Sequence, residues 1–197
     1  MSGRMTCEDD PSLPFEKHDH VVLETVRGQV RFNDPRRFGF MDLIDGSEED
    51  NRFLAALGPE PLSDAVSPAY LRAAFKDRAS PIKASLLNQR LIAGLGNIYV
   101  CEALFESGIQ PTRKTGSLKR AEVERLCAAI KGVLARAIEA GGSSLRDYKQ
   151  VSGKLGYFQH AWAVYGRENE ACRSCNAPIQ RIVQSNRSSF FCAACQR

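Results

Sequence analysis

Four cysteines near the carboxyl end constrain the fold of this chain more than any other feature. Cys172 and Cys175 form one Cys-x-x-Cys pair, and Cys192 and Cys195 form a second pair after sixteen intervening residues. Two such pairs can place four thiolates at the corners of a tetrahedron, the usual geometry of structural zinc. No fourth position would remain open, so we expect one structural Zn²⁺ ion that does no chemistry. Disulfides or unmetallated thiols are the alternatives.

The spacer between the two cysteine pairs has the pattern of a β-hairpin. Residues 179–183 and 188–191 are strand-like, and 185–187 form a turn. Arg187 would then lie at the tip of a rigid hairpin, in a segment that contains no acidic residue from Cys172 onward. A cation in that position suits phosphate binding. The alternative is a solvated turn arginine.

The remaining cysteines do not suggest a secreted protein. The total of seven is odd, whereas a disulfide framework usually has an even number. Cys101 and Cys127 are expected to be small core residues. We therefore expect a protein of the reducing cytoplasm. Met1 to Arg4 has no apolar segment behind it, so it does not resemble a signal peptide, and no apolar run is long enough to predict a membrane span.

Charge is distributed unevenly along the chain. Residues 1–64 contain 7 Lys and Arg against 14 Asp and Glu, a net charge of −7. Residues 65–197 contain 20 against 9, a net charge of +11. A basic domain favours a polyanionic partner. Charge alone does not separate DNA, RNA and anionic lipid, and an ordinary basic surface is the alternative.

The N-terminal residues predict a few β-strands. Residues 20–26 and 29–33 are β-rich around the turn at Arg27-Gly28, and a third apolar run covers 38–44. A sheet this small is marginal in water. We therefore interpret it as the end of a β-sandwich whose first half is absent.

Helix signals dominate the middle of the chain. The Ser67-Pro68 pair predicts a helix that runs to Phe75, and Ser80-Pro81 repeats that signal. The following predictions complete the pattern: a turn at 94–96, a helix capped by Asn97 and reaching about 107, a long amphipathic helix over 119–140, and a β-rich stretch at 161–165.

Residues 86–99 combine a helix, a glycine turn and a second helix start. Glycine allows another backbone to approach closely, and the helix start at Asn97 presents free N–H groups and the positive end of a helix dipole. Together they predict a phosphate-binding site. The pattern by itself is weak, because many helical hairpins contain Gly-x-Gly.

Several motifs, taken in order, resemble the formamidopyrimidine-DNA glycosylase/endonuclease VIII family across essentially the whole chain. They are residues 33–39 (NDPRRFG), 88–89 (NQ) with 94–99 (GLGNIY), 153–158 (GKLGYF), 164–167 (VYGR) and the four-cysteine hairpin. The resemblance implies an α+β fold with three parts: the truncated end of a β-sandwich (1–50), a helix-two-turns-helix domain with a lesion loop (51–160), and a zinc-finger hairpin (161–197). It implies a monomer that binds damaged duplex DNA in a cleft.

The resemblance also assigns roles to individual residues. Asn97 and Arg187 match residues that grip the phosphates beside the lesion, and Tyr165 is a weaker match of that kind. Arg36, Phe38 and Met1 match side chains that fill the hole left by a flipped base, which offsets part of the unstacking cost. For Phe38 the alternative is a place in the sheet core, and for Arg36 an ordinary turn charge.

A loop over the damaged base is implied as well. The matching residues are Val151, Ser152, Gly153, Lys154, Leu155, Gly156 and Tyr157. The methionine–arginine–phenylalanine set resembles the branch of the family that excises oxidised purines, such as 8-oxoguanine and formamidopyrimidines, and then cleaves the strand as an AP lyase.

The family's nucleophile has no match in the sequence. It is an N-terminal proline amine followed by a glutamate, whereas Ser2 follows Met1 here. We therefore expect that the N-terminal catalytic segment is absent, that no catalytic residue is present, and that the isolated chain is inactive. A glycosylase seen in part and a non-catalytic zinc-containing DNA-binding module both fit the motifs, and upstream codons for Met-Pro-Glu would discriminate them. An RNA-binding zinc ribbon leaves the wedge residues unexplained.

Overall fold

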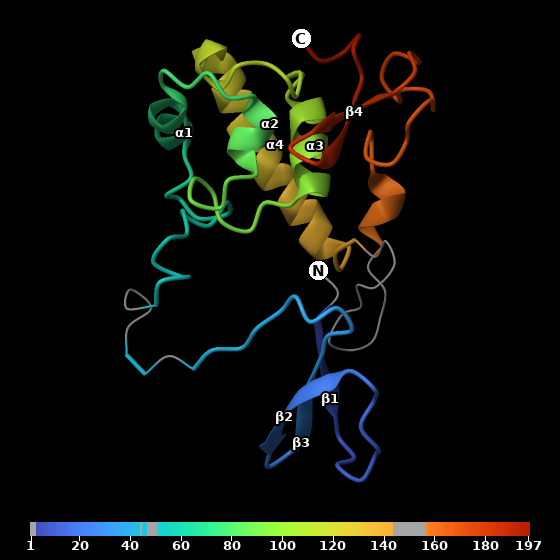
Figure 1. Ribbon diagram of the computed structural model, residues 1–197. Coiled ribbons are helices and arrows are strands. Elements are labelled where there is room, and N and C mark those ends of the chain that lie inside the picture. Colours follow the sequence, from blue (N-terminus) through green and yellow to red (C-terminus); the bar gives the residue numbers. More distant parts are fainter. Residues whose placement is uncertain (1–2, 44, 47–50, 144–156) are drawn as a thin grey trace. The chain divides into compact units, whose positions relative to one another are not determined.

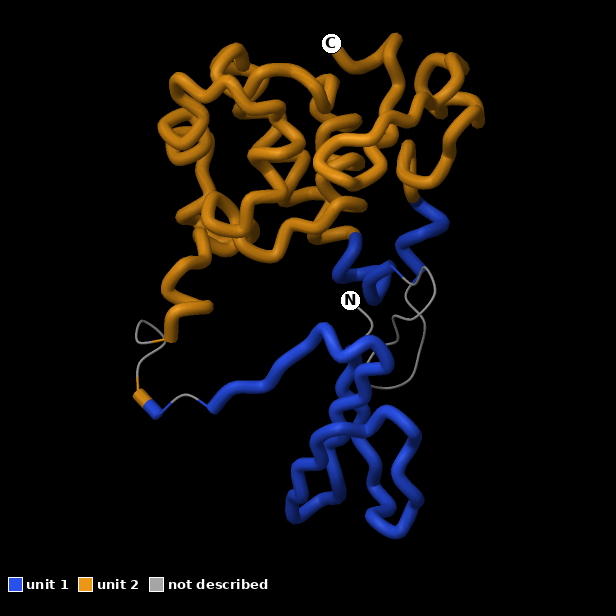
Figure 2. The backbone as a smooth tube through the Cα atoms, in the orientation of Figure 1, with its two compact units in different colours: residues 1–45, 137–161 blue, residues 46–136, 162–197 orange. Residues whose placement is uncertain are grey.

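The computed structural model describes residues 3–43, 45–46, 51–143 and 157–197 (Figure 1). The chain divides into two compact units. Unit 1 comprises residues 1–45 and 137–161, and unit 2 comprises residues 46–136 and 162–197 (Figure 2). The three-part division into 1–50, 51–160 and 161–197 stays a prediction. Among the described helices, none combines the length and apolarity needed to cross a lipid bilayer.

Unit 1 contains a three-stranded antiparallel sheet in the order β1-β3-β2. Its strands are β1 (Arg4–Glu8), β2 (Asp19–Thr25) and β3 (Gly28–Asn33). The predicted hairpin is confirmed, with Thr25 opposite Gly28. Strand β1 was not predicted, although its residues RMTCE alternate between polar and apolar.

The apolar run 38–44 was wrongly predicted to be a strand. Residues 38–43 have no regular secondary structure, and residue 44 lies outside the described residues. Buried Asp34 explains the loop, because its carboxylate accepts hydrogen bonds from the backbone N–H groups of Arg36 (3.3 Å) and Gly39 (2.7 Å). These bonds turn the chain away from the sheet instead of extending it.

Unit 2 packs its helices around an apolar core. The helices are α1 (Pro68–Phe75), α2 (Ile82–Leu86), the 3₁₀ turn η2 (Thr115–Ser117), α3 (Asn97–Glu106) and α4 (Arg120–Glu139). Ser67 caps α1 as predicted, since its hydroxyl accepts the N–H of Tyr70. Of the predicted apolar positions of α4, Val123, Leu126, Ile130, Val133 and Ala137 are buried and Leu134 is partly buried. Cys101 and Cys127 are core residues, as expected.

Two further local predictions need correction. Asn97 does not cap α3, because Gly96 is the N-cap and Asn97 is the first helical residue. Residues 161–165 are not a strand: a short 3₁₀ turn, η3 (Phe158–Ala161), is followed by bends and a turn. The cause is buried Glu102, whose carboxylate binds the N–H groups of residues 163–165 and so removes them from any ladder.

The C-terminal part of unit 2 is a β-hairpin formed by β4 (Gln180–Gln184) and β5 (Arg187–Phe191). Ser185 and Asn186 form the turn with φ angles of 49° and 60°, as a two-residue hairpin turn with both central residues at positive φ requires. The hairpin is therefore confirmed, with one correction: Arg187 is the first residue of β5 and not part of the turn.

Candidate metal centre and nucleic-acid interface

The four cysteine sulfurs form one cluster. All four Sγ atoms lie within 4.8 Å of one another, with 3.9 Å between Cys172 and Cys195 and 3.5 Å between Cys175 and Cys192. Four sulfurs at about 2.3 Å from a tetrahedral zinc ion would be about 3.8 Å apart. The cluster therefore fits one zinc ion held by four thiolates, with no position left for a substrate.

The cysteine cluster is attached to α3 through an apolar contact surface. Cys101 of α3 packs with Val164, Ile179 and Phe190 and with the buried ligand Cys192. Each of these residues is at most 9% exposed. The hairpin is therefore docked on α3, so that its strand β5 lies beside the start of that helix.

Asn97 lies at the junction between α3 and the hairpin. Its Nδ2 donates to the carbonyl of Ser188 (3.0 Å) and to the hydroxyl of Tyr165 (3.4 Å). Ser188 directly follows Arg187, whose side chain is exposed. The fold thus brings together three of the residues named from the sequence. The Oδ1 atom of Asn97 is buried and has no hydrogen-bond partner among the described residues.

Lys83 of α2 is a residue that sequence reasoning missed. It is only 1% exposed, and its Nζ donates to the carbonyl of Ser188 (2.8 Å) and to the hydroxyl of Ser189 (2.6 Å). Burial lowers the pKa of Lys83 below its usual value. To a smaller extent, the Cys101 thiol raises this pKa and the Arg187 guanidinium lowers it. Lys83 therefore holds β5 through the carbonyl of Ser188, which Asn97 binds as well.

Glu102 of α3 was missed as well. Its carboxylate, 2% exposed, accepts the backbone N–H groups of Ala163 (2.7 Å), Val164 (3.0 Å) and Tyr165 (2.8 Å). Burial raises the pKa of Glu102, while these three hydrogen bonds oppose the shift. The result is a fixed position for the Tyr165 backbone.

Two aromatic rings hold the Tyr165 side chain. Edge-to-face contacts join its ring to Trp162, at a centroid distance of 5.1 Å, and to Phe190, at 5.0 Å. This geometry is favourable for aromatic pairs. It leaves the hydroxyl of Tyr165 pointing at Asn97.

The connection between α2 and α3 forms two turns, and Gln89 closes them. Its side chain donates to the carbonyl of Leu95 (3.1 Å) and accepts the N–H of Gly94 (2.8 Å). Gly94 has a φ of +73°, which other residues adopt only with strain. No atom lies within 4 Å of a Cβ built on Gly96. The position beside Gly96, at the N-terminus of α3, is therefore not filled by other protein atoms.

Arg36 and Phe38 lie in unit 1, on the loop that Asp34 shapes. Phe38 is 71% exposed, so it is not a sheet-core residue. The Arg36 guanidinium lies over the Phe38 ring at 5.3 Å. The two side chains form one exposed pair, and Gly39 is required beside them because a Cβ there would meet the Phe32 ring at 2.7 Å.

Most of the remaining predicted site residues lie outside the part of the chain that the structure describes. Met1 and residues 151–156 of the predicted lesion loop lie outside the described residues. Tyr157, the last residue of that loop, is described: it is 68% exposed and pairs with Ser143 through an isolated antiparallel bridge.

Replacing Lys83 by Met should loosen the hairpin while keeping the volume of the side chain. Two hydrogen bonds from a buried cation would be lost, each contributing about 1.5–3 kcal/mol. We expect the free energy of unfolding in urea to fall by about 3 kcal/mol, the lower end of that sum, followed through the fluorescence of Trp162, the single tryptophan, which contacts Tyr165. The exposed Lys114→Met serves as the control. Equal stability of both variants would contradict the role given to Lys83.

Comparison with family models matches three segments of the chain. The H2TH domain of formamidopyrimidine-DNA glycosylase matches residues 57–149, the N-terminal domain of that enzyme matches residues 1–41, and the zinc finger found in FPG and IleRS matches residues 169–197. The predicted α+β fold and the single structural zinc are confirmed. The match at residues 1–41 gives no support to the expected absence of the N-terminal segment.

Relatives and solved structures agree with these matches. The chain is 53% identical to a formamidopyrimidine-DNA glycosylase of Ruegeria pomeroyi and 58% identical to one of Cereibacter sphaeroides, in each case over 100% of this chain and 74% of the relative.

Among solved structures, the MutM (FPG) protein of Thermus thermophilus aligns with a TM-score of 0.89 at 41% identity, covering 100% of this chain and 73% of that one. A complex of Lactococcus lactis Fpg with DNA containing an abasic site aligns with a TM-score of 0.88 at 36% identity, covering 100% and 71%. With this level of identity over its whole length, the chain belongs to the formamidopyrimidine-DNA glycosylase family.

Proposed function

We propose that this protein acts in base-excision repair: it binds damaged duplex DNA and is a DNA glycosylase for oxidised purines such as 8-oxoguanine and formamidopyrimidines, with AP lyase activity. One observation carries the proposal. Asn97, Tyr165 and the strand that begins at Arg187 meet at the start of α3, held by the 3.0 Å bond from Asn97 to the Ser188 carbonyl.

This junction has the chemistry of a phosphate site. The first N–H groups of α3 have no intrahelical partner, and the helix dipole favours an anion there. Gly96 leaves the approach open, and exposed Arg187 adds a full positive charge that can bind a phosphate through two parallel hydrogen bonds.

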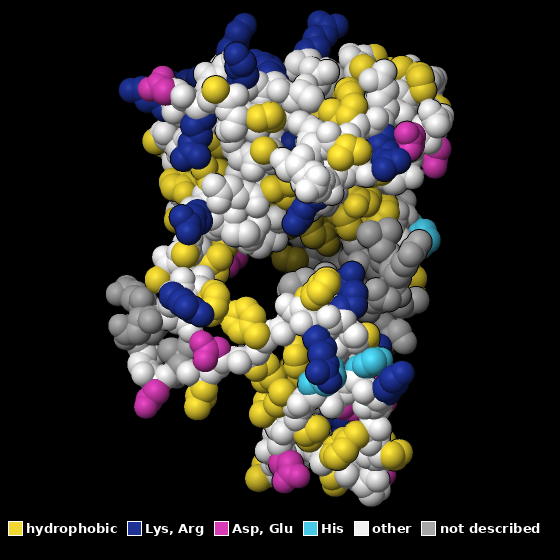
Figure 3. Space-filling model, viewed as in Figure 1, with side chains coloured by type: hydrophobic (Ala, Val, Ile, Leu, Met, Phe, Trp, Pro, Cys, Tyr) yellow, Lys and Arg dark blue, Asp and Glu magenta, His cyan; other side chains and the backbone are white. Residues whose placement is uncertain are grey.

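The relatives support DNA as the partner. The aligned Lactococcus lactis protein was solved with DNA containing an abasic site. Lys and Arg side chains predominate over acidic ones on the face of unit 2 in Figure 3, in agreement with the charge of +11 on residues 65–197. A cytoplasmic, nucleoid-associated monomer is part of the same proposal.

Base extrusion is assigned to the exposed pair in unit 1. In this proposal Phe38 enters the space left by the flipped base, Arg36 contacts the orphaned partner base, and Met1 is the third side chain. Exposure of the Phe38 ring and its contact with Arg36 support the assignment. Residues 151–157 would close over the lesion. The domain roles proposed for 1–50, 51–160 and 161–197 follow from these assignments.

Arg187→Ala should weaken binding to an abasic-site duplex and reduce its salt dependence. Each neutralised phosphate contributes about 0.9 to the slope of log K against log salt concentration, so the slope should become shallower by about that amount. Fluorescence anisotropy from low to physiological ionic strength measures it.

The control is Arg120→Ala, which removes an equal charge from an exposed arginine of α4 that pairs with Glu124. The control should leave the slope unchanged. Parallel salt plots for the parent and Arg187→Ala would refute the proposed phosphate contact.

A second candidate function is a zinc-containing DNA-binding module without catalysis. It would use the same junction of Asn97, Tyr165 and Arg187 and the same four-cysteine cluster. We propose accordingly that a polypeptide of these 197 residues binds DNA and does not by itself excise bases or cleave abasic sites.

A further inference from the structure

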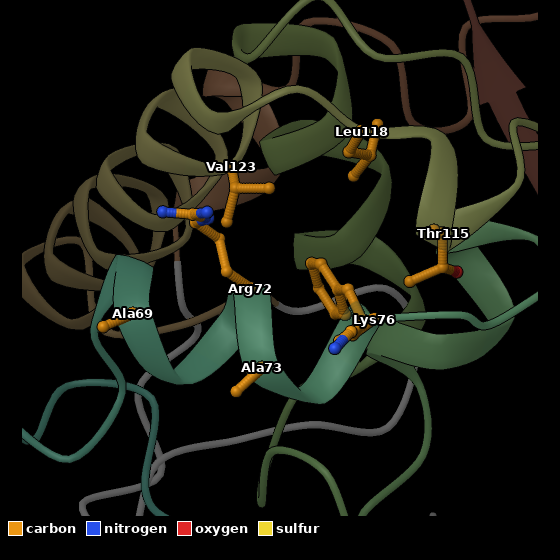
Figure 4. Close-up of a pocket in the computed structure, with 9 residues that line it drawn as sticks. Ala69, Arg72, Ala73, Lys76, Thr115, Leu118 and Val123 are labelled. Carbon is orange, nitrogen blue, oxygen red and sulfur yellow. The ribbon is translucent and has the colours of Figure 1, made fainter.

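A pocket of 490 Å³ lies in unit 2, between α1, η2 and α4 (Figure 4). It is lined by Arg72 and Phe75 of α1, Lys76 directly after it, Gly116 of η2, Leu118 after η2, and Val123 of α4. Pockets that hold ligands in proteins are about 300–1,000 Å³. None of the residues assigned to DNA contacts lines this pocket, and α1 and the β4–β5 hairpin lie on opposite sides of unit 2 (Figure 1).

Buried apolar side chains form the base of the pocket, and backbone hydrogen bonds hold the loop beneath it. Phe75 and Val123 are each 2% exposed. The loop beneath is tied to the end of α1, because the N–H of Gly116 donates to the carbonyl of Arg78 (2.9 Å). A Cβ on Gly116 would lie 3.0 Å from that same carbonyl oxygen. The cavity is therefore preformed and does not require a rearrangement before a ligand enters.

Two positively charged side chains, Arg72 and Lys76, line the pocket. Arg72 lies on α1 and Lys76 is the residue that directly follows this helix; Figure 4 shows the Arg72 side chain reaching toward Val123, with Leu118 and Thr115 across the pocket. Both cations are exposed, and within the described part of the chain no acidic side chain pairs with either. No carboxylate lines the pocket. The site is therefore complementary to a ligand that is apolar at one end and negatively charged beside it.

We propose that this pocket is a docking site for an acidic peptide segment of a partner protein. One aromatic or large aliphatic side chain of the segment enters the cavity, over Phe75, Leu118 and Val123. Carboxylates on neighbouring residues pair with Arg72 and Lys76. Duplex DNA fits less well, because a sugar–phosphate backbone presents anions without an apolar group that could fill the cavity.

The test is a titration of the ¹⁵N-labelled chain with the acetylated hexapeptide Asp-Glu-Phe-Glu-Asp-Asp. Amide shifts should concentrate in residues 69–76 and 115–123. Replacing the peptide's phenylalanine by serine should weaken binding by at least about tenfold, because burial of the ring is lost. Shifts centred elsewhere, or equal binding of the serine peptide, would overturn the proposal.

Two variants separate the pocket from general charge attraction. The double variant Arg72→Glu/Lys76→Glu should weaken peptide binding by about tenfold or more, since two attractive pairs become repulsive. Arg173→Glu/Arg181→Glu makes the same change in net charge on the zinc finger and should bind the peptide as the parent does. Ala73→Trp should also weaken binding, by filling the entrance without a charge change.

Folding of each variant is checked by the dispersion of its amide spectrum. An unchanged affinity in both Arg72→Glu/Lys76→Glu and Ala73→Trp would overturn the proposal. The same would follow if a DNA duplex shifted the amides of 69–76 and 115–123 while the peptide did not, because the pocket would then be a nucleic-acid surface.

Discussion

Chelating zinc from the reduced protein is expected to unfold the β4–β5 hairpin and release it from α3, while the helices of unit 2 remain folded. Zinc bound by four thiolates contributes about 10–16 kcal/mol to the folding of small zinc fingers. A hairpin of two five-residue strands cannot replace that contribution, because isolated two-stranded sheets are marginal in water.

The consequences should extend to the DNA-binding junction. Cys172 and Cys192 belong to the same apolar cluster as Cys101 and Phe190, so loss of the metal removes the contact surface that docks β5. The carbonyl of Ser188 would then leave Asn97 and Lys83 together. We therefore expect DNA affinity to fall along with hairpin order.

Metal analysis and hydrogen exchange measure these effects. The reduced protein should carry about one zinc per chain. Cys175→Ser should lose the zinc and the protection of amides in residues 180–191, whereas Cys7→Ser, an exposed cysteine outside the cluster, should keep both. Absence of zinc from the reduced protein, or hairpin amides that stay protected after chelation, would contradict the prediction.

The parts of the fold that could be predicted from sequence depend on local chemistry. The α1 start followed from Ser67 and the proline after it, the α4 face from its apolar spacing, and the hairpin from two cysteine pairs around a predicted turn at 185–187. Each of these signals operates between residues a few positions apart in the chain, where spacing alone fixes the geometry.

The residues that were missed act over long distances in the chain. Lys83 meets Ser188 and Ser189 across more than a hundred positions, and Glu102 meets residues 163–165 across about sixty. A lysine or glutamate in an amphipathic helix is usually solvated, so nothing local distinguished them. The Phe38–Leu43 run was misread for the opposite reason: its local pattern suited a strand, but a buried carboxylate at Asp34 determined the loop.

A polypeptide of these 197 residues is expected to form no covalent adduct when it is mixed with an abasic-site or 8-oxoguanine duplex and reduced with borohydride. Adduct formation requires an unprotonated amine aimed at the sugar carbon. The family resemblance implies a proline amine with a neighbouring glutamate for that role, whereas Ser2 follows Met1 in this polypeptide. Loss of general acid–base assistance alone typically costs about 10²–10⁴-fold in rate.

Two other amines, those of Lys17 and Lys83, are poorly suited to replace it. Lys17 lies in an exposed turn between β1 and β2, where no described contact holds its side chain in an attacking geometry. Lys83 is buried, and its Nζ donates to the carbonyl of Ser188 and the hydroxyl of Ser189. An unpositioned lysine forfeits most of the rate advantage that orientation provides, about 7–11 kcal/mol in well-oriented systems. The 197-residue polypeptide should therefore bind the duplex in this assay without becoming covalently attached to it.

Two controls make the trapping result decisive. A full-length relative, such as the Ruegeria pomeroyi enzyme, should give a strong adduct with the same duplex, and the 197-residue polypeptide should shift that duplex in a binding assay. A strong adduct from the 197 residues would refute the prediction, and peptide mapping would then identify the amine. Loss of that adduct in Lys17→Ala would identify Lys17 as the nucleophile, whereas an adduct that persists in Lys17→Ala and maps to residue 1 or 2 would assign the chemistry to the chain's own α-amine.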